Sequence, residues 1–228
     1  MPVPLGHDRA FSLIELLVTV SLIALLIGLM LPVLGQAKRQ GQRAGCLANL
    51  RSIEQAHHAY AIDHGGQMLG TSHGASWIEA LRSYSEALVM RSPVDTSPHF
   101  PGGDTVGGTY RQTSYALNYW LSPDNPAGTK RIDRIAAPSA VVHITLLTFT
   151  GSNAANDHVH PHLWQSAIPG NTPAVAASEV QIHAYTGRPA DARSLSGYGF
   201  LDGHAEARAF DTVFTDDQTN QFDPAVAR

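Results

Sequence analysis

The sequence predicts an α+β fold in which one long N-terminal helix, with its first half in a membrane, packs on a C-terminal antiparallel β-sheet head. Three observations predict it. An uncharged apolar run covers residues 16–37, and an apolar stripe at helical spacing continues beyond it to residue 64. From residue 115 onward, apolar and polar residues alternate between turn signals. The 228 residues leave one head of ordinary domain size once the helix is subtracted.

The apolar run is long enough to cross a bilayer. At about 1.5 Å per residue it covers about 33 Å, against a hydrocarbon core of about 30 Å. Glu15 lies at its N-terminal edge, where burying a carboxylate costs about 2–3 kcal/mol, so this charge needs a partner. A secretory signal peptide is disfavoured because the run is long and no small-x-small cleavage site precedes Lys38. A plain signal anchor leaves Glu15 unexplained.

The segment Ala10-Phe11-Ser12-Leu13-Ile14-Glu15-Leu16-Leu17-Val18 resembles the processing site of type IV prepilins and type II secretion pseudopilins. The resemblance implies that a prepilin peptidase/methyltransferase cleaves between Ala10 and Phe11 and methylates the new amine of Phe11. The family's early glutamate matches Glu15, its helix-kinking proline matches Pro32, and Ala10 stands where the family nearly always has glycine. Glu15 of one subunit is then expected to pair with the Phe11 amine of its neighbour during assembly, so that neither charge remains alone.

The same resemblance implies a structural subunit of a type II secretion pseudopilus or type IV pilus-like filament, with no catalysis and no required cofactor. A leader of residues 1–10 would precede the helix of residues 11–64. Expected partners are other copies of the chain, minor pseudopilins, an inner-membrane assembly platform and membrane lipid. The protein would cross the bacterial inner membrane once and place its head in the periplasm or in an extracellular filament.

One charge pattern opposes this orientation. Four basic residues follow the span, namely Lys38, Arg39, Arg43 and Arg51, and the positive-inside rule alone would keep that side in the cytoplasm. The family resemblance takes precedence over it. The net charge is −4 and the 15 basic residues form no dense patch, so no nucleic-acid partner is expected. His-Glu-x-x-His pairs, phosphate loops and dinucleotide fingerprints do not occur in the sequence.

Beyond the span, the helix is predicted to continue to a stop at Gly65-Gly66. Its apolar stripe consists of Leu47, Leu50, Ile53, Ala56 and Tyr60. The run Cys46-x-x-Asn49-Leu50 is similar to a C-x-N-L stretch of pseudopilin-like proteins. Cys46 is the only cysteine, so an intramolecular disulfide is impossible, and a small buried residue on a helix is the simpler interpretation of it.

The head is predicted over residues 65–210. A second helix is expected from Trp77 to Leu88, a long surface loop over 96–113, and strands over 115–121, 141–149 and 180–184, with 141–149 as the central strand and 115–121 half-buried. Ser92-Pro93-Val94-Asp95 stands where the relatives carry a Cys-Pro-x-Asp turn. The last residues, 211–228, are acidic and weakly patterned, and a mobile tail is expected.

The stretch from Gly199 to Arg208 predicts a closing hairpin with a type I′ turn at Asp202-Gly203. Phe200-x-Asp202-Gly203-His204 also resembles the C-terminal H-X9-DG motif of prepilin-like proteins. The match is degenerate because Ala192 occupies the place of the motif's histidine.

The alternative function is a membrane-anchored periplasmic metal-dependent hydrolase. In Asp157-His158-Val159-His160-Pro161-His162, alternate residues share a face if the segment is extended. His158, His160 and His162 could then converge on Zn²⁺, assisted by Asp202 or His204. Surface-loop histidines are the simpler interpretation. The family resemblance also allows a structural calcium ion, for which Asp104, Asp124 and Asp157 offer oxygens without a recognisable spacing.

Overall fold

The computed structural model describes residues 12–71, 76–85, 90–167 and 170–228. The chain forms two compact units, one up to residue 41 and one over residues 42–228.

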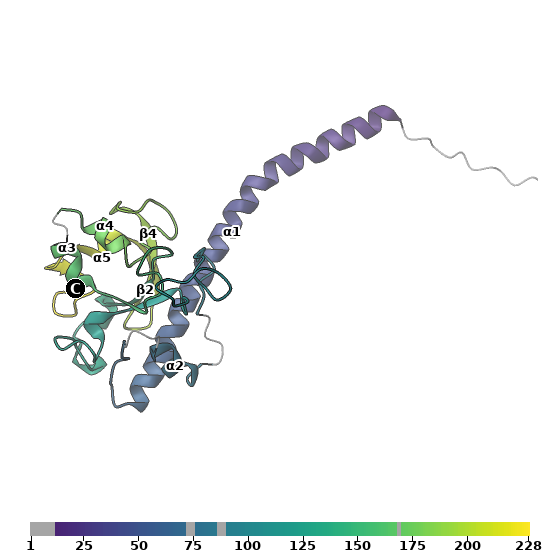
Figure 1. Cartoon of the computed structure of the whole chain (residues 1–228). Helices are drawn as coiled ribbons and strands as arrows, with labels where there is room; N and C mark the ends of the chain where they lie inside the picture. The colour runs from purple at the N-terminus through teal and green to yellow at the C-terminus, as the bar shows by residue number, and fades with distance from the viewer. Residues whose placement is uncertain (1–11, 72–75, 86–89, 168–169) are drawn as a thin grey trace, which may run out of the picture. The chain divides into compact units, whose positions relative to one another are not determined.

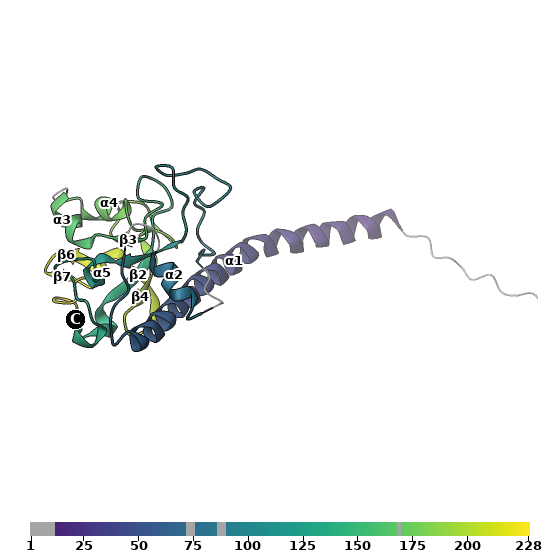
Figure 2. The same ribbon diagram turned by 60° about the horizontal axis from the view of Figure 1, so that its bottom comes forward.

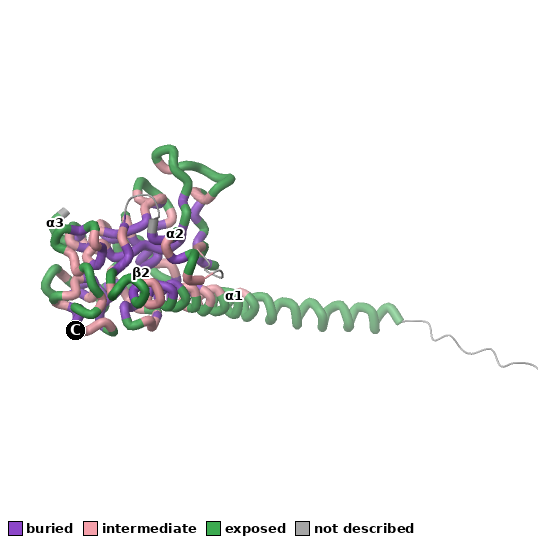
Figure 3. Tube along the Cα trace, turned by 90° about the horizontal axis from the view of Figure 1, so that it is seen from below, coloured by how far each residue is buried: buried purple, intermediate pink, exposed green. Residues whose placement is uncertain are grey.

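Helix α1 (Leu13–Asp63) begins in the first unit and ends in the second. The predicted long helix is confirmed with bounds of 13–63 rather than 11–64, and Phe11 lies outside the described residues. In the first unit, every large apolar side chain from Leu13 to Leu34 is at least 50% exposed (Figure 3). An apolar helix surface of this length, left without protein contacts, requires lipid or other subunits to cover it.

The head is built on a five-stranded sheet of order β3-β1-β2-β4-β5, of which Figure 2 labels β2, β3 and β4. Its strands are β1 (Tyr115–Asn118), β2 (Val142–Leu146), β3 (His158–Val159), β4 (Leu195–Phe200) and β5 (Ala205–Ala209). The α+β class and the central place of β2 are confirmed. The sheet is mixed rather than purely antiparallel, because β3 runs parallel to β1 at the outer edge.

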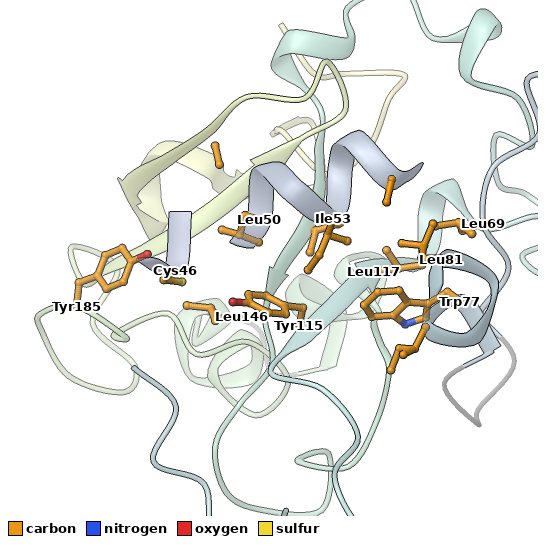
Figure 4. Close-up of a cluster of buried hydrophobic side chains, with 14 residues drawn as sticks. Cys46, Leu50, Ile53, Leu69, Trp77, Leu81, Tyr115, Leu117, Leu146 and Tyr185 are labelled. Atoms are coloured by element: carbon orange, nitrogen blue, oxygen red, sulfur yellow. The ribbon is translucent and has the colours of Figure 1, made fainter. Parts of the chain in front are cut away.

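The second half of α1 packs on one face of the sheet together with α2 (Ser76–Arg82), as the close-up of this core shows (Figure 4). Cys46, Leu50 and Ile53 of α1 belong to this core, as does Leu117 of β1. These stripe positions agree with the sequence prediction. Helix α2 ends at Arg82 rather than Leu88, which itself lies outside the described residues.

The other face of the sheet is covered by a second apolar core. It contains residues of α3 (Trp164–Ala167), α4 (Thr172–Ala177), α5 (Phe210–Val213) and β6 (Phe214–Asp216), and β7 (Thr219–Asn220) pairs with β6. Figure 1 shows α3, α4 and α5 grouped on one side of the head. Short 3₁₀ helices connect the larger elements at Tyr119–Leu121, Ile132–Arg134, Pro138–Ala140 and Pro161–Leu163.

Because both faces are covered, β1 is buried along its whole length, and the prediction of a half-buried strand over 115–121 is wrong. The strand is also shorter than predicted, since Asn118 ends it. The Asn118 Oδ1 atom accepts a hydrogen bond from Trp120 N at 3.1 Å, which caps the 3₁₀ turn that follows.

Strand β4 approaches α1 closely because two of its residues lack side chains. A Cβ atom on Gly197 would lie 2.5 Å from the Tyr185 hydroxyl and 3.3 Å from Leu50 Cδ1. One on Gly199 would lie 3.3 Å from Glu54 Oε1. Glycine at these strand positions allows the helix to lie directly against the sheet.

The predicted third strand at 180–184 is absent. Val180 and Ile182 are buried, but their backbone forms turns with one isolated bridge between Leu147 and Val180. Strand β2 pairs with β1 and β4 along most of its length, so this segment meets only the end of β2, where Gln181 N donates to Leu146 O at 2.8 Å.

The predicted hairpin forms between β4 and β5, but its turn is not type I′. Gly203 has a φ of 97°, whereas Asp202 has no positive φ, and type I′ requires positive φ at both central residues. Phe200 N donates to His204 O at 2.9 Å and Gly203 N donates to Phe200 O at 2.9 Å. This is a three-residue loop that ends in a left-handed glycine, the next most common hairpin connection.

The prediction of a mobile tail over 211–228 is also wrong. Phe222 is fully buried in the second core, and its carbonyl accepts a hydrogen bond from Asn118 Nδ2 at 2.6 Å. Val142 N of the central strand donates to Gln221 O at 2.6 Å. The tail therefore closes one face of the sheet, which its acidic composition did not indicate.

Candidate functional site

The first turn of α1 is a capping box formed by Ser12 and Glu15. Ile14 N donates to Ser12 Oγ at 3.3 Å, and Ser12 N donates to Glu15 Oε2 at 3.1 Å. The two side chains thus satisfy backbone donors that the helix cannot satisfy itself. The Glu15 carboxylate also lies at the positive end of the helix dipole. Ala10 and Phe11, the predicted cleavage residues, lie outside the described residues.

The apolar half of α1 satisfies its own polar groups. Thr19 Oγ1 donates to Leu16 O at 2.9 Å and Ser21 Oγ donates to Leu17 O at 2.8 Å. Such internal bonds leave no side-chain donor for water, as a lipid environment requires. Pro32 lies inside the helix, and because it has no N–H, one backbone bond of the ladder is missing there.

The residues of the run Cys46-x-x-Asn49-Leu50 pack against the sheet in the head. Cys46 and Leu50 are fully buried, and Asn49 Nδ2 donates to the Tyr115 hydroxyl at 3.0 Å. Burial raises the pKa of the Cys46 thiol, although hydrogen bonds from Ser92 and other neighbours oppose this. A buried, protonated thiol is unreactive. The motif therefore joins the helix to the sheet.

The Asp202-Gly203-His204 segment is the turn between β4 and β5. His204 Nδ1 lies 2.5 Å from Asp202 Oδ1, and the His204 ring stacks on Phe200 with centroids 4.3 Å apart. Burial alone would raise the pKa of Asp202, but hydrogen bonds from His204 hold it below its ordinary value. These contacts stabilise the turn locally.

In the predicted zinc cluster, His158 and His160 bring two ring nitrogens close together, whereas His162 lies farther away. His158 Nε2 and His160 Nε2 are 3.1 Å apart, so one ring donates a hydrogen bond to the other. The outer nitrogens bind carboxylates, because His158 Nδ1 lies 2.7 Å from Asp157 Oδ1 and His160 Nδ1 lies 2.9 Å from Glu179 Oε1. The His162 ring centroid is 6.0 Å from that of His160.

The proposed calcium residues are placed apart from any compact ligand group in the described residues. Asp104 and Asp124 are exposed, and Asp124 Oδ2 accepts a hydrogen bond from Thr71 N at 2.6 Å. The third, Asp157, binds His158 as described above.

A different polar cluster lies between α1 and β2, consisting of Glu54, His57 and His143. All three are buried, with at most 1% of each residue exposed. His143 Nδ1 lies 2.9 Å from Glu54 Oε2 and 3.1 Å from Glu54 Oε1, and His57 Nδ1 lies 3.7 Å from Glu54 Oε2. Of the described residues, only this group brings three possible ligand atoms within 4.8 Å of one another.

Burial dominates the electrostatics of this cluster, because a low-dielectric interior disfavours charge. It lowers the pKa of His57 to about 4 and that of His143 to about 3, and it raises the pKa of Glu54. Both imidazoles are therefore neutral at pH 7. Sequence reasoning missed this cluster, although two signals were present: Glu54 and His57 lie three residues apart on a helix, and His143 interrupts the most apolar strand.

The comparisons with known proteins concern the N-terminal segment. The family model described as the prokaryotic N-terminal methylation motif matches residues 6–31. The chain is prepilin-like at its N-terminus. No curated protein and no solved structure is significantly similar to the chain. The matched segment contains the predicted cleavage residues and Glu15, and it ends just before Pro32.

By length and composition, α1 of this prepilin-like chain is suited to cross a membrane once, with an 18-residue apolar window of which none is buried. Two of the four basic residues that follow the span are used inside the head. Arg43 Nη2 donates to Tyr185 O at 3.0 Å, and Arg51 Nη2 donates to Ala205 O at 2.9 Å. These arginines thus have a structural role on α1 that is independent of membrane orientation.

Proposed function

We propose that this prepilin-like protein is a structural subunit of a type II secretion pseudopilus or a type IV pilus-like filament. The observation that carries the proposal is the methylation motif at residues 6–31 followed directly by an apolar helix with its side chains exposed over Leu13 to Leu34. In a filament, the same surface that first lies in lipid is buried against neighbouring subunits.

A prepilin peptidase/methyltransferase is the expected processing partner. Cleavage before Phe11 creates an amine one residue upstream of Ser12, next to the carboxylate that caps α1. Within a bundle of apolar helices, the Glu15 carboxylate of one copy and the Phe11 amine of the next would neutralise each other. This pairing gives Glu15 a role in addition to its capping bond.

The remaining partners follow from this role. They are further copies of the chain, minor pseudopilins, an inner-membrane assembly platform and membrane lipid. The head of residues 42–228 would lie in the periplasm or on the filament surface, and the leader in the cytoplasm. The family match concerns the methylation motif alone and gives the hydrolase alternative no support, so a hydrolase is not proposed.

Two substitutions at Glu15 test the assembly role. Glutamine can replace glutamate in a capping box, so Glu15→Gln keeps the helix cap and removes the charge, whereas Glu15→Ala removes both. We expect both variants to be processed normally and to be absent from filaments sheared off the cells, measured by immunoblot against wild type. Normal incorporation of Glu15→Gln would show that Glu15 acts only as a cap and would refute the pairing role.

A further inference from the structure

We propose that Glu54, His57 and His143 form a structural zinc site that fastens α1 to the central strand of the head. The inference is independent of the filament role. It concerns the fold of residues 42–228, where a single cysteine rules out an internal disulfide.

The three side chains supply the atoms that a zinc ion prefers. Imidazole nitrogen and carboxylate oxygen bind Zn²⁺ at about 2.0–2.2 Å, so neighbouring ligand atoms around a tetrahedral ion lie about 3.3 Å apart. The Glu54 Oε2 atom lies 2.9 Å from His143 Nδ1 and 3.7 Å from His57 Nδ1. These separations bracket the expected value, so small side-chain rotations would complete the coordination.

The hydrogen bonding of the cluster is incomplete without an additional partner. His57 is fully buried, yet neither of its ring nitrogens has a hydrogen-bond partner, and 3.7 Å to Glu54 is too long for one. Buried polar atoms are nearly always satisfied in folded proteins. A cation between His57, Glu54 and His143 would give one ring nitrogen of His57 a partner and compensate the buried carboxylate of Glu54 at the same time.

The backbone of β2 is irregular at the residue that the site needs. Val142 pairs with Phe200 and Ile144 pairs with Gly199, so His143 is an extra residue opposite β4. Such a bulge redirects a side chain relative to the regular alternation of a strand. It places His143 in contact with Glu54 of α1, while the absent side chain of Gly199 leaves space beside Glu54 Oε1.

His58 lies between this cluster and the surface. Its ring centroid is 5.9 Å from that of His57, and its buried Nε2 atom has no hydrogen-bond partner. His58 also lines a surface pocket of about 290 Å³ together with Gly66 and Arg131. His58 is not among the residues whose ligand atoms lie within 4.8 Å of one another, so a water molecule would supply the fourth ligand. Three protein ligands and a water molecule also occur at catalytic zinc sites, but all three protein ligands here are buried, so the site is suited to hold an ion rather than to bind a substrate.

The test uses the full chain in detergent micelles, stripped with a chelator, dialysed and then titrated with Zn²⁺. We expect about one zinc per chain by elemental analysis, and a melting temperature that rises by about 5 °C or more at saturating zinc. The variants Glu54→Gln, His57→Asn and His143→Asn should each lose both effects. His64→Ala, which removes an exposed imidazole just after the end of α1, is the matched control and should keep both.

The second histidine cluster requires its own control. The double variant His160→Ala/His162→Ala should bind zinc as wild type does, and X-ray absorption of its zinc-loaded form should show two imidazoles and a carboxylate. This measurement decides the question even if the site variants fail to fold. Absence of stoichiometric zinc in wild type, an unchanged melting temperature, or loss of zinc only in the double variant would overturn the proposal.

Discussion

At the scale of single residues, Arg111 carries a fully buried charge in the described part of the head. Its guanidinium is fully buried and donates to Asp95 Oδ2 at 2.7 Å, to Ala154 O at 2.7 Å and to Leu147 O at 3.1 Å. It thereby joins the segment after α2, the end of β2 and the loop before β3. Asp95 belongs to the turn where the family resemblance implies a cysteine, and the ion pair ties that turn to the sheet.

Asp95→Ala should strongly destabilise the head, because it leaves the Arg111 charge buried without its counter-charge. Breaking such a pair costs about 3–5 kcal/mol. The measurement is the free energy of unfolding in urea. Asp133→Ala is the matched control, since it breaks the solvent-exposed pair between Asp133 and Arg131 and should leave stability unchanged. Equal effects of the two substitutions would contradict the importance of the buried pair.

The contacts of the Glu179 carboxylate predict that the stability of the head depends on pH. Burial alone would raise the pKa of Glu179, but hydrogen bonds from the His160 side chain, His160 N and Trp164 Nε1 hold it below the ordinary value of 4.5. A depressed folded-state pKa stabilises the protein above the unfolded-state value, and this contribution is lost as pH falls through the folded-state pKa.

Glu179→Gln should therefore destabilise the head at pH 7, and the difference in melting temperature from wild type should shrink below about pH 4.5. Thermal melts of both proteins between pH 7 and pH 3 measure it. A difference that stays constant over this range would show that the Glu179 charge contributes nothing.

At the scale of elements, the fit of α1 against β4 depends on glycine. Gly197→Ala should destabilise the head by about 1–3 kcal/mol, because the added methyl group would overlap the Tyr185 hydroxyl and press on Leu50. Gly41→Ala is the matched control on α1, where a Cβ meets nothing within 4 Å, and it should stabilise the helix by about 0.5–1 kcal/mol. Urea denaturation compares the two, and a neutral Gly197→Ala would contradict this packing.

The elements that the sequence predicted correctly are those whose signal is local. The stripe of Leu50 and Ile53 defines the buried side of α1, and the apolar run around Ile144 predicts the central strand. The predictions fail where contacts with other elements of the fold decide the structure of a segment. Val180 and Ile182 are apolar enough for a strand, but β1 and β4 pair with β2 along most of its length and leave only its end to this segment. Local composition does not carry that information.

The C-terminal tail and the buried cluster were missed for a related reason. Phe222 is one apolar residue in an acidic stretch, and it becomes a core residue because Asn118, far away in sequence, binds its carbonyl. His143 and Glu54 are likewise separated by 89 positions. Contacts between distant segments of this kind cannot be derived from spacing within one segment.

At the scale of the whole molecule, the chain consists of two units with different features. The first unit carries the methylation motif, the helix cap and the exposed apolar surface, and the second unit is a head with two cores on either side of one sheet. The N-terminal part of this division was predictable, because cleavage residues, Glu15 and Pro32 lie in one continuous segment.

If the chain is a prepilin-like precursor, the N-terminus of the mature protein shows how it was processed. Mass-spectrometric sequencing of protein extracted from membranes should find a chain that begins at Phe11 and carries a methylated amine. The same cells without the prepilin peptidase should contain only the uncleaved chain. A mature protein that begins at Met1, or at any residue after Lys38, would contradict the account.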